Sequence, residues 1–181
     1  LQSQEGAWSV SGKQPLLGFS HGTAGYIAAL VKLGQQLGER RFLDGATKAL
    51  TYERERFDSK YRNWPDYRSY QPDAPNKFMT SWCHGAPGIA LSRACLFGSP
   101  LWDEICVDEM ATALQTLTAL ELPFHDNLCC GTFGNAGILR IVAEGPWAKS
   151  LPESVRTAAI ERSSELVALA VYKANSNGGL F

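Results

Sequence analysis

Three short glycine-rich stretches hold most of the cysteine and histidine in this chain. They are "GFSHGTAG" (18–25) with His21, "SWCHGAPG" (81–88) with Cys83 and His84, and "LCCGTFGNAG" (128–137) with Cys129 and Cys130. Zinc binds three or four sulfur or nitrogen atoms in a tetrahedron, and cysteines at helix N-termini ionise readily. Three thiols from two such turns therefore predict a zinc site, although their spacing is not that of a zinc finger.

The sequence leaves the fourth ligand of that site open. His84 or His125 would close a structural zinc site, whereas a catalytic site would keep the position for water or substrate. Taken singly, each turn cysteine has an alternative interpretation as a small side chain at a crowded helix start. His125 could equally be a helix cap, a surface residue or a partner of a ligand. We expect Cys95 and Cys106, which lie among apolar neighbours, in the core.

The elements that must position these side chains are paired helices. Apolar residues recur at three- and four-residue steps over 24–38 and 41–57, over 87–98 and 99–121, and over 135–145 and 152–175. In each pair a glycine turn introduces a short apolar helix, and a more charged amphipathic helix follows. Strand patterns are almost absent. The repeat predicts an all-α fold of three helical hairpins, with the glycine turns gathered at one end of the array.

A long insertion separates the first hairpin from the second. Residues 58–80 contain three of the nine prolines and several aromatic residues. Loops of this length in a compact domain are usually functional or disordered. Two interpretations of this loop stay open: Trp64 and Tyr67 line the mouth of a site and contact its ligand, or the segment is a partly mobile surface loop.

Composition excludes several classes of protein. The 181 residues carry 17 Lys and Arg against 18 Asp and Glu, with no basic run, so nucleic acid is not an expected partner. No stretch is long and apolar enough for a transmembrane segment, and the N-terminus does not match a signal peptide. Five cysteines, two of them adjacent, favour reduced thiols and a cytoplasmic location.

The length suits one domain, and the ends suggest that residues 1–181 are a segment truncated on both sides.

The three turns, in this order, resemble the lanthionine synthetase C-like (LanC-like) family of peptide cyclases. The combination of "SHGTAG" and "SWCHGAPG" is most similar to the C-terminal cyclase domains of class II (LanM-type) lanthipeptide synthetases. The resemblance implies an α/α toroid of about seven helical hairpins, here a partial toroid of about three, and an N-terminal dehydratase domain in the full-length parent. A partial toroid has an open edge, so the isolated segment need not be active even if its parent is.

The same resemblance implies roles for individual residues. Cys83, Cys129 and Cys130 would bind Zn²⁺, with a third thiolate at the position where most relatives have histidine. His21 matches the family histidine regarded as the general acid or base. His84 occupies a position where relatives carry tyrosine or histidine near the active site. The aspartate that relatives carry on an earlier repeat has no match in this sequence.

The implied function is zinc-dependent peptide cyclisation. A lanthionine synthetase adds cysteine thiols of a lanthipeptide precursor to dehydroalanine or dehydrobutyrine, and so forms lanthionine or methyllanthionine thioether rings. Two alternatives remain open: a noncatalytic or glutathione-binding member of the same family, and a helical-repeat scaffold whose zinc is structural or absent.

Overall fold

The computed structural model describes residues 2–9, 14–69, 71, 75, 77–121 and 125–177. The helices in this part of the chain are α1 (Thr23–Leu37), α2 (Arg40–Arg54), α3 (Ala86–Ala94), α4 (Glu104–Thr118), α5 (Thr132–Glu144) and α6 (Glu153–Ser176), with short 3₁₀ turns at Tyr67–Ser69 and Ala148–Ser150. Two short antiparallel strands, β1 (Pro65–Asp66) and β2 (Lys77–Phe78), are the only other regular elements among the described residues. The predicted all-α class is confirmed. No described helix has the length and apolar character needed to cross a membrane.

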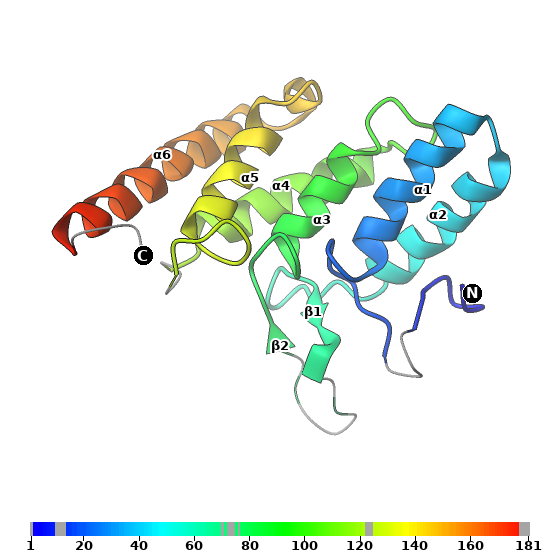
Figure 1. Cartoon of the computed structure of the whole chain (residues 1–181). Coiled ribbons are helices and arrows are strands. Elements are labelled where there is room, and N and C mark those ends of the chain that lie inside the picture. The colour runs from blue at the N-terminus through cyan, green and yellow to red at the C-terminus, as the bar shows by residue number, and fades with distance from the viewer. Residues whose placement is uncertain are drawn as a thin grey trace.

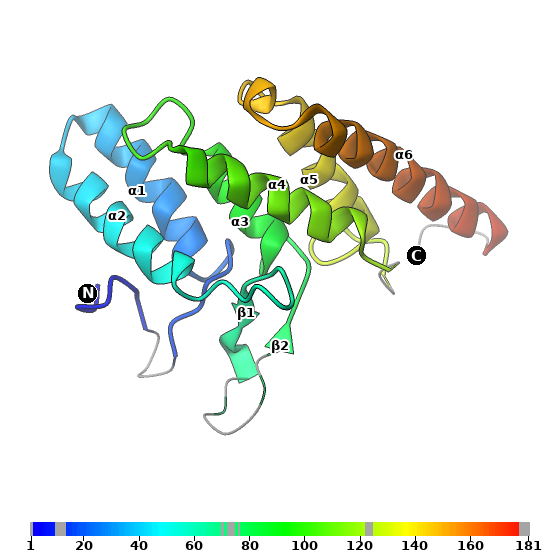
Figure 2. The same cartoon turned by 180° about the vertical axis from the view of Figure 1, so that it is seen from behind.

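The helices pack as three hairpins in a row. Helix α1 packs on α2, α3 on α4, and α5 on α6, while α3 contacts both α1 and α5. Figure 1 shows the hairpins as an open arc, and the view from behind in Figure 2 shows α4 and α6 in front of α3 and α5. The predicted hairpins and their order are therefore confirmed, and α1, α3 and α5 form one layer of the array.

Helix α4 is shorter than the pattern over 99–121 predicts. It begins at Glu104 because Asp103 is its N-cap, and the Asp103 carboxylate accepts a hydrogen bond from the Cys106 backbone N–H. Side-chain caps of this kind satisfy backbone donors that have no partner inside the helix. Residues 99–103 instead form the link between α3 and α4.

The N-terminal ends of α1, α3 and α5 lie along one edge of the array, the lower edge in Figure 1. Each of these helices starts at a glycine N-cap: Gly22, Gly85 and Gly131. Strands β1 and β2 lie at the same edge. The predicted gathering of the glycine turns is thus observed, and the insertion between the first two hairpins folds toward them.

Two cysteines expected in the core have different environments. Cys106 is fully buried beside Ile27 and Val31, as predicted. Cys95 is exposed, so its prediction was wrong. The physical reason is that α3 ends at Ala94, and Cys95 is its C-cap, where the chain leaves the buried helix face.

A buried ion network links the first two hairpins. The Arg93 guanidinium of α3 lies 2.6 Å from Glu53 of α2 and donates a 2.7 Å hydrogen bond to Glu109 of α4. Thr23 of α1 donates to the second oxygen of Glu53, at 2.8 Å. Arg93 and Glu53 have no exposed side-chain surface. Four helices therefore meet at one charged cluster inside the molecule.

The insertion is more ordered than a simple surface loop. Trp64 is 1% exposed and packs in the main hydrophobic cluster, so the interpretation that it lines the mouth of a site was wrong. Tyr67 packs against the same cluster from its rim. Asn63 fixes the start of α3, since its side-chain oxygen accepts the Ala86 N–H at 2.7 Å and its amide donates to the Met79 carbonyl at 3.2 Å. The insertion is thus an anchored support for the second glycine turn.

Candidate metal centre

The structure brings the three turn cysteines together. The Sγ atoms of Cys83, Cys129 and Cys130 all lie within 4.8 Å of one another, and no disulfide joins them. Sulfur atoms around a tetrahedral zinc ion are separated by about 3.8 Å, given zinc–sulfur bonds of about 2.3 Å. The observed distances between the Sγ atoms need to shorten only slightly to reach that geometry. Among the described residues this is the one group of side chains suited to hold a metal ion.

Hydrogen bonds between the second and third turns hold the cysteines close. Asn135, in the first turn of α5, donates from its side chain to the Thr80 carbonyl at 3.0 Å, three residues before Cys83. Within the third turn, the Asn127 side chain accepts the Cys130 backbone N–H at 2.8 Å. Backbone and amide contacts therefore help to hold together thiols that are 46 positions apart in the chain.

Glycine permits the tight packing of these turns. Gly85 has a φ of +89°, and a Cβ atom there would lie 1.8 Å from the Met79 carbonyl oxygen. A Cβ on Gly18 would lie 1.9 Å from the Cys83 carbonyl oxygen. No side chain fits at either place, because real Cβ contacts are not shorter than about 3 Å. The first turn can thus pack directly against the second, which brings the His21 turn to the cysteines.

The cluster is unfavourable as three thiolates without a cation. The hydrogen bond with the Cys129 thiol, partial burial and the nearby Cys83 raise the pKa of Cys130 to about 11. The protein alone therefore keeps that thiol protonated at neutral pH. A divalent cation reverses this preference, since its charge stabilises the thiolates that bind it. The donor set consequently fits a soft or borderline metal such as zinc.

Both candidate histidines lie beside the cluster but outside it. His84 is 2% exposed, and its ring centroid is 6.4 Å from that of His21, which is exposed. Burial lowers the pKa of His84, with Asp66 opposing the shift and Arg68 and His21 adding to it. His84 is therefore neutral at pH 7, whereas His21 is open to solvent and to a ligand.

Two residues of the insertion lie beside His84 and were not predicted. Asp66, at the end of β1, has a carboxylate oxygen 3.7 Å from Nδ1 of His84. Arg68 holds that carboxylate with hydrogen bonds of 3.0 Å from Nε and 2.6 Å from Nη2. Although burial alone would raise the pKa of Asp66, the bonds from Arg68 lower it. Asp66 is thus an ionised carboxylate next to His84.

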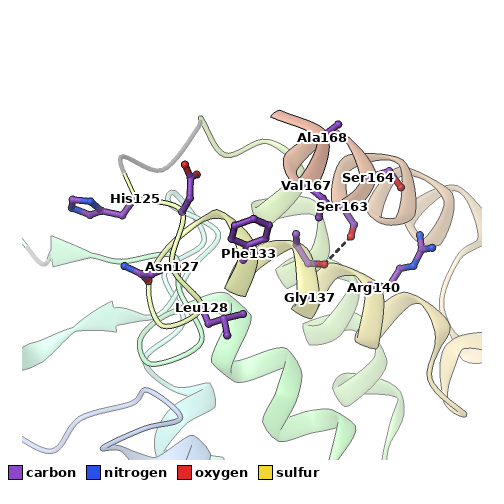
Figure 3. Close-up of a pocket in the computed structure, with 12 residues that line it drawn as sticks. His125, Asn127, Leu128, Phe133, Gly137, Arg140, Ser163, Ser164, Val167 and Ala168 are labelled. Atoms are coloured by element: carbon purple, nitrogen blue, oxygen red, sulfur yellow. Dashed lines mark hydrogen bonds between the residues drawn. The ribbon is translucent and has the colours of Figure 1, made fainter. Parts of the chain in front are cut away.

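His125 takes no part in the group of thiols. Its side chain is exposed, and its backbone carbonyl accepts the Thr132 N–H at 2.9 Å at the start of α5. It borders an open groove of about 1190 Å³ formed by the third turn, α5 and α6 (Figure 3). Phe133 and Val167 contribute to this groove, but none of the described cysteines does. Of the three roles left open for His125, the surface position and the backbone cap agree with the structure.

Comparison with known proteins now bears on this arrangement. The sequence model of the family described as lanthionine synthetase C-like protein matches residues 2–165. The chain belongs to the lanthionine synthetase C-like family. That membership supports a role of the lanthionine cyclase type, acting on peptides, and identifies the three hairpins as part of a LanC-like toroid. A search of the curated proteins gave no significant match.

Proposed function

We propose that this LanC-like chain is part of a zinc-dependent cyclase that forms lanthionine and methyllanthionine rings in a lanthipeptide precursor. Residues 1–181 would be a segment of the cyclase domain of a cytoplasmic class II (LanM-type) synthetase, preceded in the parent by a dehydratase domain. The turn sequences "SHGTAG" and "SWCHGAPG" support the class II assignment.

One observation carries the proposal: the thiols of Cys83, Cys129 and Cys130 converge, and no fourth metal-binding side chain joins them among the described residues. A zinc site with three protein ligands and an open position is typical of catalysis, whereas structural sites are closed by a fourth. The His21 ring lies 6.4 Å from the ring of His84, which follows Cys83 in the chain, and this pair of histidines supports proton transfer at such a site.

The reaction divides between metal and protein. Bound zinc supplies a Lewis acid that favours the thiolate form of a substrate cysteine. The new carbon–sulfur bond forms at the β-carbon of the dehydroamino acid, and the electron pair of its double bond moves to the α-carbon. The α-carbon then takes a proton, a role that we assign to His21, whose exposed ring lies 6.4 Å from that of His84. The thiol proton leaves to solvent, so the product is an isomer of the substrate.

The test combines metal content with a count of free thiols in a dehydrated, cysteine-containing peptide. Ring formation leaves the peptide mass unchanged but removes thiols from alkylation. We expect the wild-type chain to bind about one zinc ion. Cys129→Ala should lose this zinc and retain its helical circular dichroism. The control Cys95→Ala, which lies outside the cluster, should keep the zinc. We expect His21→Ala to keep zinc and to lose most of the cyclisation, since general acid catalysis contributes about 100-fold or more.

The alternatives predict other results. A glutathione-binding member would leave peptide thiols free and add glutathione to dehydroamino acids. A structural zinc would make Cys129→Ala unfold, because structural sites contribute directly to folding free energy. Either result would contradict the cyclase proposal.

A further inference from the structure

Arg68 has a position that the proposed mechanism does not yet use. It lies in the 3₁₀ turn just after β1, and its side chain is 48% exposed, while the Asp66 carboxylate that it holds is 11% exposed. Its Nη2 atom also lies 3.0 Å from Sδ of Met79, four residues before Cys83. The insertion thus brings one guanidinium, fixed at two of its nitrogens, to the second glycine turn.

The Arg68 guanidinium is linked to the second glycine turn through Asp66, whose carboxylate lies 3.7 Å from Nδ1 of His84, the residue after Cys83. Its hydrogen bond to Asp66 raises the pKa of Arg68, and Cys83 and Cys130 add to this shift although burial opposes it. The guanidinium is therefore held through Nε and Nη2 beside the second glycine turn, which carries Cys83.

The charge at the centre creates a need for such a cation. Zinc with three thiolates carries a formal charge of −1, and a fourth thiolate makes it −2. Binding a fourth thiolate is thus opposed by the charge already present, and the ionised Asp66 beside the same turn would add to this repulsion if Arg68 did not pair with it. We propose that Arg68, held in place by Asp66, is the residue that favours binding of the substrate cysteine as a thiolate at the three-cysteine centre.

This inference rests on the proposed function, and its test measures thiol binding without turnover. The 181-residue chain is loaded with Co²⁺ and titrated with N-acetylcysteine methylamide, following the thiolate-to-cobalt absorption. We expect Arg68→Gln to raise the apparent dissociation constant about threefold to tenfold, because the guanidinium is half exposed and its effect partly screened. Arg68→Lys, which keeps the charge, should stay within about twofold of wild type.

Arg62→Gln is the matched control, since it removes an arginine of the same insertion that donates instead to Gln115 on α4. It should leave thiol affinity unchanged. The ratio of dissociation constants between Arg68→Gln and wild type should also shrink as ionic strength rises from about 0.05 M to about 0.5 M, since salt screens exposed charges. A merely structural role of Arg68 would not give that salt dependence.

The outcomes separate the two proposals. Unchanged thiol affinity in Arg68→Gln, or equal losses in Arg68→Gln and Arg68→Lys, would overturn the role of Arg68 while leaving the cyclase proposal intact. A full-length parent protein that binds metal and thiol but forms no rings would overturn the cyclase proposal, and the Arg68 effect would still be measured. A wild-type chain that takes up no metal would overturn both.

Discussion

The third thiol, Cys130, sets the charge of the candidate centre. A histidine at that position would make the zinc-loaded site one unit less negative, because imidazole binds metal in its neutral form. Excess negative charge weakens the bond from the metal to a further sulfur and leaves that sulfur more nucleophilic. A third cysteine at position 130 would therefore make a metal-bound substrate sulfur more nucleophilic. The same negative charge would weaken binding of that sulfur, and a nearby cation such as Arg68 would reduce this effect.

We predict that Cys130→His retains zinc but forms rings at least about threefold more slowly and with a narrower choice of ring pattern, since one full charge is removed from the metal ligands. Alkylation time courses with tandem mass spectrometry on several dehydrated peptides would measure both effects. Cys95→His, on the exposed C-cap of α3, is the control. Equal rates and equal ring patterns in the two variants would refute this view of the charge.

At the scale of elements, the start of α3 is the critical junction. Its N-cap Gly85 packs on the Met79 carbonyl, Asn63 binds its first backbone N–H, and Cys83 lies two residues earlier. The thiol position thus depends on a helix start that the insertion holds from outside. A change that moves this junction should affect metal binding without touching a ligand.

Gly85→Ala and Gly98→Ala test that dependence as a pair. Both glycines have positive φ, +89° and +76°, but an added Cβ at Gly98 meets no atom within 4 Å. Gly98→Ala should therefore cost only about 1 to 2 kcal/mol of backbone strain and keep zinc. Gly85→Ala should cost at least about 2 kcal/mol more and lose zinc, because the Met79 carbonyl must move. Urea unfolding and metal analysis measure both, and equal results for the pair would contradict the packing argument.

At the scale of the whole molecule, different contacts join different hairpins. The Arg93 network links the first hairpin to the second, through Glu53 on α2 and Glu109 on α4. The thiol cluster links the second hairpin to the third. Metal binding should therefore stabilise one junction, while the buried ions stabilise the other whether or not metal is bound.

We expect Arg93→Met to lower the free energy of unfolding by about 3 to 5 kcal/mol, equally with and without zinc, because the fully buried Glu53 loses its charged partner, although Glu109 keeps its ion pair with Arg54. The matched control is Arg140→Met, which removes an exposed ion pair with Glu144, 3.1 Å long, on α5. It should change stability by less than about 1 kcal/mol. Denaturant titrations of zinc-loaded and chelator-treated protein make the comparison, and a cost of Arg93→Met that vanished on zinc removal would contradict it.

The sequence by itself determined the hairpins, their order and the residues at the centre. Helical periodicity and glycine turns are local properties, so the pattern over 24–38 predicts α1 to within one residue at each end, and three glycine N-caps place Cys83 and Cys129 at the same edge. The motif resemblance predicted the family that the family model then matched.

Only the tertiary structure decided how the insertion meets the centre. The approach of Asp66 to His84 and of Arg68 to Met79 depends on a strand pair that brings residues 65–66 against 77–78. Nothing in the spacing of Trp64 or Cys95 showed that one would be buried and the other exposed. Burial and charge contacts arise from packing between segments distant in the chain, and local periodicity carries no information about them.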